Sequence, residues 1–257
     1  MTPTASAAIV GLAVVLAVAT ALWTLSLKLR DASVADIGWG PGFALLAWLY
    51  AAWPGAFGPR PVLVAVLLTL WGVRLGWHLY QRHRDEDPRY QAMRAARGAS
   101  FWWRSLFIVF WLQAAILWFV ALPVLGAARP PHGLVTFDLI GALVFCAGFT
   151  FEAIADRQLA RFRANPASRG RVLDTGLWRY TRHPNYFGDA LLWWGIFVIA
   201  CATPGGWWMV GSPLAMTWLL LRVSGVTLLE RTLKTSKPGY EEYIRRTPAF
   251  VPWRPRS

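Results

Sequence analysis

Charged residues are scarce in this sequence, and cysteine is almost absent. Only 15% of the 257 residues are charged, and the 13 acids are half as numerous as the 26 Lys and Arg. Cys146 and Cys201 stand far apart in apolar stretches, so neither a disulfide framework nor a metal site is expected. The sequence also lacks a phosphate-binding loop, a Rossmann glycine fingerprint, an HExxH motif and a GxSxG motif. Any nucleotide would therefore have to be held by arginines, amides and aromatic side chains.

Hydrophobic residues make up 56% of the chain and include 17 tryptophans, a composition typical of proteins that lie in lipid. A helix needs about 20 mostly apolar residues to cross the hydrocarbon core, where its backbone groups can bond only to one another. The sequence predicts seven such helices, at residues 5–27, 37–53, 62–80, 101–125, 137–155, 186–203 and 206–229. We therefore expect an all-α polytopic membrane protein that forms a single domain over residues 1–257.

The positions of the basic residues predict the orientation of the chain. Of the 26 Lys and Arg, 21 follow the first, third, fifth or seventh predicted helix. By the positive-inside rule, the N-terminus is outside and the C-terminus is cytoplasmic. Topology and contact with anionic membrane lipids account for some of the basic residues behind the net charge of +13. Neither a nucleic-acid partner nor a protein partner is expected.

Polar side chains gather where the fifth predicted helix ends. Glu152, Asp156, Leu159 and Arg163 recur at i, i+4, i+7 and i+11 and fall within an arc of roughly 60°. Such an arc is either a charge-paired helix end or a binding face. An acid as deep in an apolar run as Glu152 is costly without a partner or ligand, which favours a binding face.

A basic motif precedes the sixth predicted helix. Four arginines surround a glycine-containing turn there: Arg169, Arg171, Arg179 and Arg182. Guanidinium groups fit phosphates bidentately, and a helix N-terminus adds backbone donors. Pro184 suits the first turn, and His183 or Asn185 either caps the helix or binds a ligand. Asn185, Asp189 and Trp193 then recur every four residues on one face, which is more than capping requires.

Two further places in the first half of the chain carry polar groups among apolar ones. Arg74 and His78 share a face near the end of the third predicted helix, where the arginine is either a ligand or a snorkelling side chain. Asp36 opens the second predicted helix and is either its N-cap or a functional acid.

Together these residues resemble the steroid 5-alpha-reductase superfamily, in particular its bacterial branch of functionally unassigned inner-membrane proteins. The similar segments read "EAIADRQLARFR", "GLWRYTRHPNYFGDALLWWG", "DIGWG", "EDPRY" and "YEEYIRRTPAFVPW". The resemblance implies seven transmembrane helices in the bacterial inner membrane and an active site that faces the cytoplasm. It also implies that NADPH reduces a carbon–carbon double bond, typically of an enone, in a lipid or steroid-like substrate.

The resemblance assigns roles to individual residues. The expected NADPH site consists of Asp156, Arg163, Arg171, Arg179, Arg182, His183, Asn185, Tyr186, Asp189 and Trp193. For the family's catalytic glutamate and tyrosine, Asp36 is the nearest acid, and Tyr80 or His78 stands in for the tyrosine. Asp189 replaces a glutamate of the animal enzymes and Glu152 replaces an asparagine, and an acid at Glu152 would repel a phosphate unless a cation lies between them.

A second enzyme class shares part of this signature. Isoprenylcysteine carboxyl methyltransferases and related membrane methyltransferases resemble "RYTRHPNYFG" and the tail with Glu230, and they bind S-adenosylmethionine. Asp156, Arg163, Asp189 and Trp193, with the excess of cytoplasmic arginines, favour the reductase. A purely structural protein is a further alternative, whereas the apolar outer halves of the predicted helices argue against a transporter.

Overall fold

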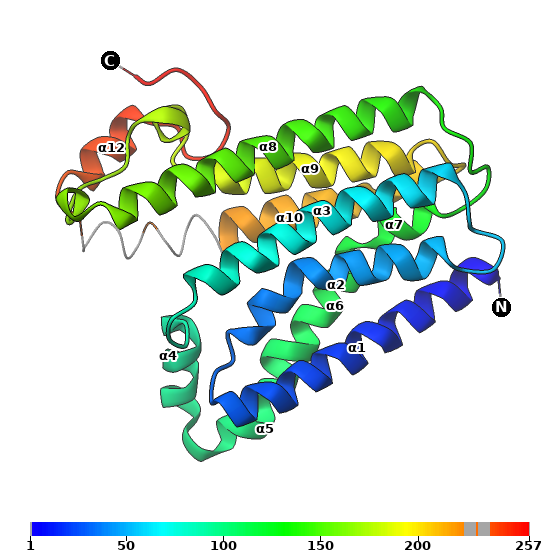
Figure 1. The fold of residues 1–257 in the computed structure, drawn as a ribbon, viewed down its shortest axis with the longest axis horizontal. Helices are drawn as coiled ribbons and strands as arrows, with labels where there is room; N and C mark the ends of the chain where they lie inside the picture. Colours follow the sequence, from blue (N-terminus) through cyan, green and yellow to red (C-terminus); the bar gives the residue numbers. More distant parts are fainter. Residues whose placement is uncertain (1, 224–229, 231–236, 257) are drawn as a thin grey trace. The chain divides into compact units, whose positions relative to one another are not determined.

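The computed structural model describes residues 2–223, 230 and 237–256, and these residues form helices, turns and loops without a strand (Figure 1). The elements in order are α1 (Pro3–Leu29), α2 (Val34–Ala51), α3 (Pro59–Arg82), α4 (Pro88–Arg97), η1 (Gly98–Ser100), α5 (Phe101–Ser105), η2 (Leu106–Trp111), α6 (Leu112–Val120), α7 (Leu122–Ala127), α8 (Thr136–Ala164), η3 (Pro166–Ser168), η4 (Gly176–Arg179), α9 (Pro184–Ala200), η5 (Gly206–Val210), α10 (Gly211–Trp218), η6 (Leu219–Val223) and α12 (Tyr240–Arg246). The predicted all-α class is confirmed for these residues.

Four helical stretches of the described chain are long and apolar enough to cross a membrane: Pro3–Leu29, Pro59–Arg82, Pro88–Val120 and Thr136–Ala164. They correspond to the first, third, fourth and fifth predicted helices. The second and sixth predicted helices appear as α2 and α9, which are not among these four. The seventh is helical through residues 206–223, and its predicted end at residues 224–229 lies outside the described residues. The total of seven spans stays a prediction.

The chain divides into two compact units. Unit 1 comprises Met1–Asp138 and Ile199–Met209, and unit 2 comprises Leu139–Val198 and Val210–Ser257. Each unit carries one polar cluster, and the two clusters are described separately below. That the whole chain acts as one domain stays a prediction.

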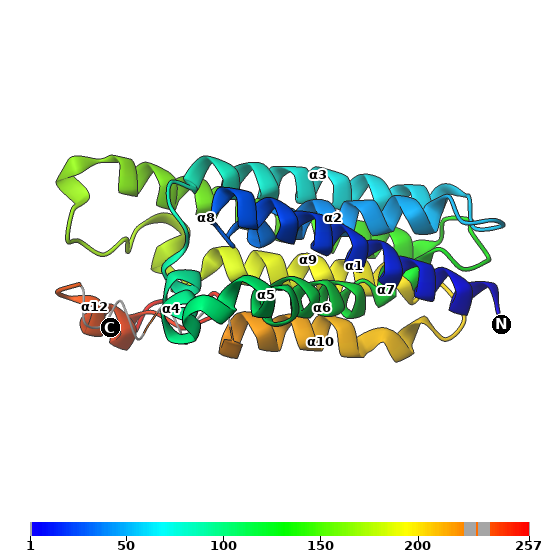
Figure 2. The ribbon, with the colours of Figure 1, turned by 90° about the horizontal axis from the view of Figure 1, so that it is seen from below.

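In unit 1, hydrogen bonds from indole groups attach α1 to the chain around α6. The Trp111 Nε1 donates to Thr20 Oγ1 at 3.0 Å, and the Trp118 Nε1 donates to the carbonyl oxygen of Ala8 at 2.8 Å. Figure 2 shows α5, α6 and α7 following one another along a common direction. Because buried N–H groups need acceptors, these bonds fix α1 against α6 as well as satisfying the indoles.

The backbones of α2 and α3 approach each other closely at a pair of glycines. A Cβ added to Gly40 would lie 2.6 Å from the carbonyl oxygen of Gly72, closer than any side chain tolerates. Small residues let two helices pack backbone to backbone, which adds dispersion contacts in lipid where the hydrophobic effect is absent. This contact holds α2, and with it Asp36 in its first turn, against α3.

In unit 2, glycines bring α8 and α9 together in the same way. A Cβ on Gly188 of α9 would lie 2.5 Å from the Glu152 backbone nitrogen and 2.6 Å from the Gly148 carbonyl oxygen. A Cβ on Gly195 would lie 2.6 Å from the Phe145 backbone nitrogen, one heptad further along. These contacts fix the distance between α8 and α9, and with it the distance between the polar side chains at their ends.

Replacing Gly188 by alanine is expected to lower the free energy of unfolding by about 1–3 kcal/mol, because both clashing atoms belong to a helix backbone and cannot rotate away. Reversible unfolding in mixed detergent micelles, followed by tryptophan fluorescence, measures the change. The matched control is Gly133→Ala, whose new methyl group would meet nothing within 4 Å. Equal stability of the two variants would show that the glycine contact is not tight in the protein.

Candidate functional site

In unit 1, four polar side chains from three helices meet at the start of α2. The Tyr90 hydroxyl donates to Asp36 Oδ1 at 2.8 Å, and the Arg89 guanidinium donates to Asp36 Oδ2, also at 2.8 Å. From α6, the Gln113 amide donates to the Tyr90 oxygen at 2.9 Å and to Asp36 Oδ1 at 3.3 Å. A carboxylate, a phenol, an amide and a guanidinium are thus linked in one network.

Local sequence explains why α4 presents Tyr90 and Arg89 to Asp36. Asp87 caps α4 by accepting from the Arg89 backbone nitrogen at 2.9 Å, and Pro88 occupies the first helical position. Burial alone would raise the pKa of the Asp87 carboxyl, but hydrogen bonds and charge from Arg89 lower it below its usual value. The Asp87 backbone nitrogen also donates to Ser33 Oγ at 2.8 Å, which ties α4 to the turn before α2. Figure 1 shows α4 lying across the direction of α1 and α3.

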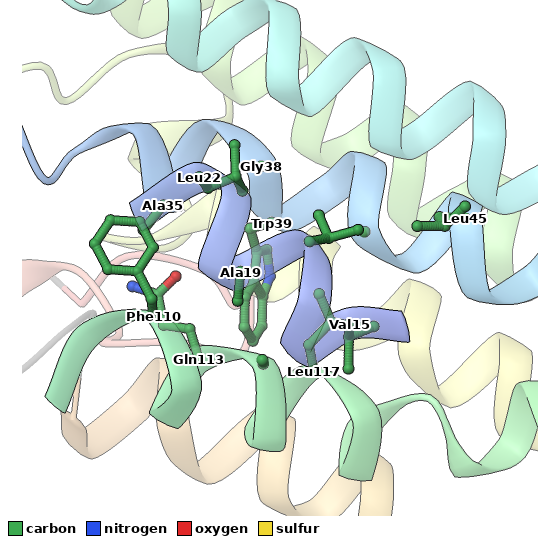
Figure 3. A pocket seen from close by; sticks show the side chains of 13 residues that line it. Val15, Ala19, Leu22, Ala35, Gly38, Trp39, Leu45, Phe110, Gln113 and Leu117 are labelled. Carbon is green, nitrogen blue, oxygen red and sulfur yellow. The ribbon is translucent and has the colours of Figure 1, made fainter. Parts of the chain in front are cut away.

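An apolar groove with about 410 Å³ of empty space, counted with its open side, adjoins this cluster (Figure 3). It is lined by Val15, Val18, Ala19 and Leu22 of α1, by Ala35, Gly38, Trp39, Gly42 and Leu45 of α2, and by Phe110, Gln113, Ala114 and Leu117. Gln113 is the one polar side chain of this lining and also belongs to the Asp36 cluster. The groove therefore has a polar end and an apolar body.

The structure brings Tyr90, which the sequence analysis did not name, to Asp36. The Tyr80 side chain is 60% exposed and stacks on Trp77 with ring centroids 5.8 Å apart. His78 lies half-buried on α3. Sequence reasoning missed Arg89, Tyr90 and Gln113 as site residues, although the "EDPRY" segment that contains two of them is part of the family resemblance.

In unit 2, the predicted polar faces of α8 and α9 do meet. The Asn185 amide donates to Asp156 Oδ1 at 3.1 Å, and the Asp156 residue is only 5% exposed. The Tyr186 ring stacks on the His183 ring with centroids 5.6 Å apart. Glu152 is buried one turn before Asp156, beside the glycine contact of α8 with α9. Asp189 is half-buried and Trp193 is buried on α9.

Arg182 is engaged inside unit 2. Its guanidinium donates to Glu230 Oε1 at 2.7 Å and to the carbonyl oxygens of Ile244 and Thr247 at 3.1 and 2.6 Å. His183 Nε2 lies 3.2 Å from the same Glu230 oxygen. Burial alone would raise the pKa of Glu230, but hydrogen bonds from His183 and Arg182 lower it to about 2. Arg182 therefore joins Glu230 and the C-terminal segment, residues 237–256, to the start of α9, and its guanidinium is not available to a phosphate.

The other predicted arginines of the site are exposed. Arg163 lies at the end of α8, Arg171 in the loop that follows, and Arg179 at the end of η4. The Arg171 carbonyl oxygen accepts from the Lys237 ammonium group at 2.6 Å, which adds a fourth cation to this region. Exposed cations at the end of α8 and in the connection from α8 to α9, in the same unit as the part-buried Asp156–Asn185 pair, suit an anionic ligand that also offers hydrogen-bonding groups.

The fold and the two clusters define an all-helical membrane protein with an acid–phenol pair at an apolar groove and a basic region in its second unit. Over residues 22–247 the chain matches the family described as "Protein of unknown function (DUF1295)", and it belongs to this family. A fission yeast (Schizosaccharomyces pombe) relative, "Uncharacterized protein C594.04c", is 24% identical over 280 residues, covering 95% of this chain and 79% of the yeast protein. No solved structure matches the chain.

Proposed function

We propose that this protein is a membrane-bound, NADPH-dependent reductase of a carbon–carbon double bond conjugated to a carbonyl in a lipid. The observation that carries the proposal is the hydrogen bond between Tyr90 and Asp36, 2.8 Å long, at the polar end of an apolar groove. An acid and a phenol beside an apolar wall are the groups that polarise a substrate carbonyl. The resemblance to the steroid 5-alpha-reductase superfamily supports the same reaction.

In this proposal the chain's own residues hold the carbonyl oxygen and manage its proton. Tyr90 donates a hydrogen bond to that oxygen as negative charge develops on it, and Asp36 shares the proton with Tyr90. Arg89, whose guanidinium lies 2.8 Å from Asp36, keeps the two groups in place. With the oxygen held in this way, the β carbon would gain the hydride that NADPH would supply, and the α carbon would gain a proton that ultimately comes from water.

The residues of unit 2 fit NADPH. Its phosphates require several cations, which Arg163, Arg171 and Arg179 offer on the exposed side of the unit. Asp156 and Asn185 form a hydrogen-bonded pair that suits a ribose or a carboxamide, with Asp189, Trp193, His183 and Tyr186 on or beside α9. When bound, NADPH supplies the hydride, and the protein supplies orientation and electrostatics.

One observation favours a second candidate, an S-adenosylmethionine-dependent methyltransferase of the isoprenylcysteine carboxyl methyltransferase type. Arg182 and His183 both bind Glu230, so the motif shared with that class is used here to hold the C-terminal segment. Arg182 is then no longer among the arginines that can bind the phosphates of NADPH. A sulfonium cofactor with one carboxylate needs fewer cations than NADPH.

The proposal includes the finer topology. Seven transmembrane helices, an external N-terminus and a cytoplasmic C-terminus would put Asp36, α4 and the arginines of unit 2 on the cytoplasmic side, where NADPH is available. A bacterial inner membrane follows from the family resemblance. The basic residues at the end of α3 and along α4 suit the cytoplasmic surface of such a membrane, where they contact anionic lipids.

The test is a thermal-shift comparison of the purified protein with NADPH, NADH and S-adenosylmethionine. A ligand at 100 times its dissociation constant stabilises the folded state by about 2.7 kcal/mol, so NADPH should raise the melting temperature. Arg171→Ala should weaken NADPH binding by about tenfold or more, because a charge-assisted contact is lost. Arg157 is an exposed arginine of α8 that is not among the residues proposed to bind the phosphates, so Arg157→Ala should leave the NADPH affinity unchanged. A response to S-adenosylmethionine alone would replace the reductase by the methyltransferase.

A further inference from the structure

In unit 2, residues 248–256 come after α12 and are bonded to the chain just before α9 (Figure 1). The Trp253 backbone nitrogen donates to the Tyr180 carbonyl oxygen at 2.9 Å. Three residues earlier, the Phe250 carbonyl oxygen accepts from Thr181 Oγ1 at 2.8 Å. These bonds fix the backbone of residues 248–256, and with it the direction of the side chains that point outward.

Aromatic contacts place this part of the chain at one end of the apolar part of α8. The Phe250 ring packs on the Phe187 ring of α9 with centroids 5.8 Å apart, and Phe187 packs on Phe151 of α8 with centroids 5.5 Å apart. About 20 residues cross the hydrocarbon core, so a span that begins at the start of α8 ends near Ala155. Phe151 is one helical turn, roughly 6 Å, before that residue. Phe250 therefore lies close to the level where hydrocarbon meets headgroups.

Two apolar side chains at this level point away from the protein. Trp253 is 74% exposed and Val251 is 63% exposed. Tyr180, Pro252, Trp253 and Arg254 together line an open hollow of the surface. Tryptophan and tyrosine are enriched where bilayer and water meet, because their rings are apolar and their N–H or O–H groups bond to headgroups. An exposed tryptophan that is held in place at this level therefore suits the surface of a bilayer.

The charges around these side chains favour an anionic surface. Residues 243–256 include four arginines and no acid. Arg254 and Arg256 are exposed, and the side chain of neither forms an ion pair with any residue that the structure describes. Guanidinium groups bind phosphates through two hydrogen bonds, and basic residues beside a membrane attract anionic lipids. An acidic protein would match the charges as well, but it would not account for apolar side chains exposed at the edge of the hydrocarbon.

We propose that residues 248–256 dock on the bilayer surface beside α8 and bind an anionic phospholipid there. Trp253 and Val251 enter the boundary between acyl chains and headgroups, and Arg254 binds the lipid phosphate. Because the same residues are bonded to the chain just before α9, the bound lipid also holds them at the start of that helix. This inference is independent of the proposed reaction, since it requires neither NADPH nor a substrate.

The experiment uses the full-length protein in nanodiscs that contain phosphatidylcholine and phosphatidylglycerol in known proportion. The photoreactive amino acid p-benzoylphenylalanine in place of Trp253 keeps an aromatic ring at this position and cross-links to neighbouring C–H bonds on illumination. Mass spectrometry of the adducts should show phospholipid on this residue. The control carries the same amino acid in place of Glu242, a polar and 60% exposed side chain of α12, and should give at least about tenfold less lipid adduct.

A comparison of two arginine variants tests the choice of lipid. With the probe at Trp253, phosphatidylglycerol should be enriched about fivefold among the adducts over its share of the bilayer, as one arginine near an anionic surface provides. Arg254→Gln should abolish this enrichment. Arg245→Gln removes an equal charge from an exposed position of α12 and should preserve it.

Two results would overturn the inference. One is an equal yield of lipid adduct at the two probe positions, and the other is the same enrichment of phosphatidylglycerol in both arginine variants. The probe at Trp253 is also illuminated in native membranes, where lipid adducts should again predominate. A protein adduct formed there in place of the lipid adduct would show that this surface binds a protein and not the bilayer.

Discussion

Replacing Arg60 by methionine is expected to lower the free energy of unfolding by about 3–5 kcal/mol, because it leaves a buried carboxylate without its cation. Arg60 is fully buried at the start of α3, and its Nε donates to Asp138 Oδ1 at 2.7 Å while a terminal nitrogen donates to Oδ2 at 3.1 Å. The same guanidinium donates to the carbonyl oxygens of Pro131 and Gly133. One side chain thus satisfies a carboxylate and two backbone acceptors of the segment before α8.

Unfolding in mixed detergent micelles measures this loss, and two companion variants identify its cause. Arg60→Met combined with Asp138→Leu should recover most of the stability, since no charge is then buried alone. Arg129→Met removes a half-buried arginine whose guanidinium makes an exposed hydrogen bond to the carbonyl oxygen of Pro204, and it should cost less than about 1 kcal/mol. A loss below about 1 kcal/mol for Arg60→Met would mean that water reaches Asp138.

The long apolar helices and the polar residues of α8 and α9 could be found from the sequence because these signals are local. A 3.6-residue period placed Asp156 and Asn185 each on a polar face of its predicted helix, and the structure shows these two side chains in contact at 3.1 Å. Apolar length alone identified the long helices. Gly148 and Gly188 allow α8 and α9 to pack closely. The sequence alone does not show this contact, because it does not show which faces of the two helices meet.

The Asp36 cluster of unit 1 depends on contacts between residues distant in sequence. Tyr90 reaches Asp36 across 54 positions because the connection after α3 turns back and α4 is capped by Asp87. Periodicity on α3 instead led to Tyr80, which lies on the exposed face of that helix. The choice between two tyrosines ten residues apart depends on the path of a loop, which no helical pattern encodes.

Residue type likewise could not tell which arginines are available to a ligand. Arg179 and Arg182 stand three positions apart in one motif, yet one is exposed and the other is used by Glu230 and two carbonyl oxygens. A guanidinium suits a phosphate and a carboxylate equally well. Only the fold, which brings Glu230 to the start of α9, decides between these roles.

Replacing Glu230 by glutamine is expected to release the C-terminal segment from the rest of unit 2. The Glu230 and Arg182 side chains are only 16% and 9% exposed, so loss of the carboxylate charge leaves a largely buried guanidinium short of its counter-charge. A cost of about 3 kcal/mol for breaking such a pair corresponds to an increase of about a hundredfold in the population with a released segment. Trypsin cleavage after Arg246 should accelerate accordingly. Glu242→Gln is the control, because the Glu242 carboxylate forms only an exposed ion pair with Arg246, at 3.6 Å, and its loss should leave the cleavage rate unchanged.

The same contact should make docking of the segment depend on pH. The pKa of Glu230 falls from 4.5 to about 2, because hydrogen bonds and charge from His183 and Arg182 outweigh the effect of burial. A lowered pKa stabilises the docked form fully above pH 4.5, and this stabilisation is lost as the pH falls from 4.5 through about 2. Tyr240 does not titrate in this window, since burial and the charge of Glu230 raise its pKa to about 12.

Pepsin, which is active in that window, can follow the release through cleavage at Phe250, whose carbonyl oxygen accepts from Thr181 Oγ1 at 2.8 Å when the segment is docked. Cleavage of the parent protein should accelerate as the pH is lowered from 4.5 to 2. The Glu230→Gln variant should be cleaved rapidly throughout this range. The ratio of the two cleavage rates should therefore approach one at the acidic end. A ratio that stays constant across the window would mean that Glu230 does not control docking. In that case the carbonyl oxygens of Ile244 and Thr247, which bind Arg182 at any pH, would be what holds the segment.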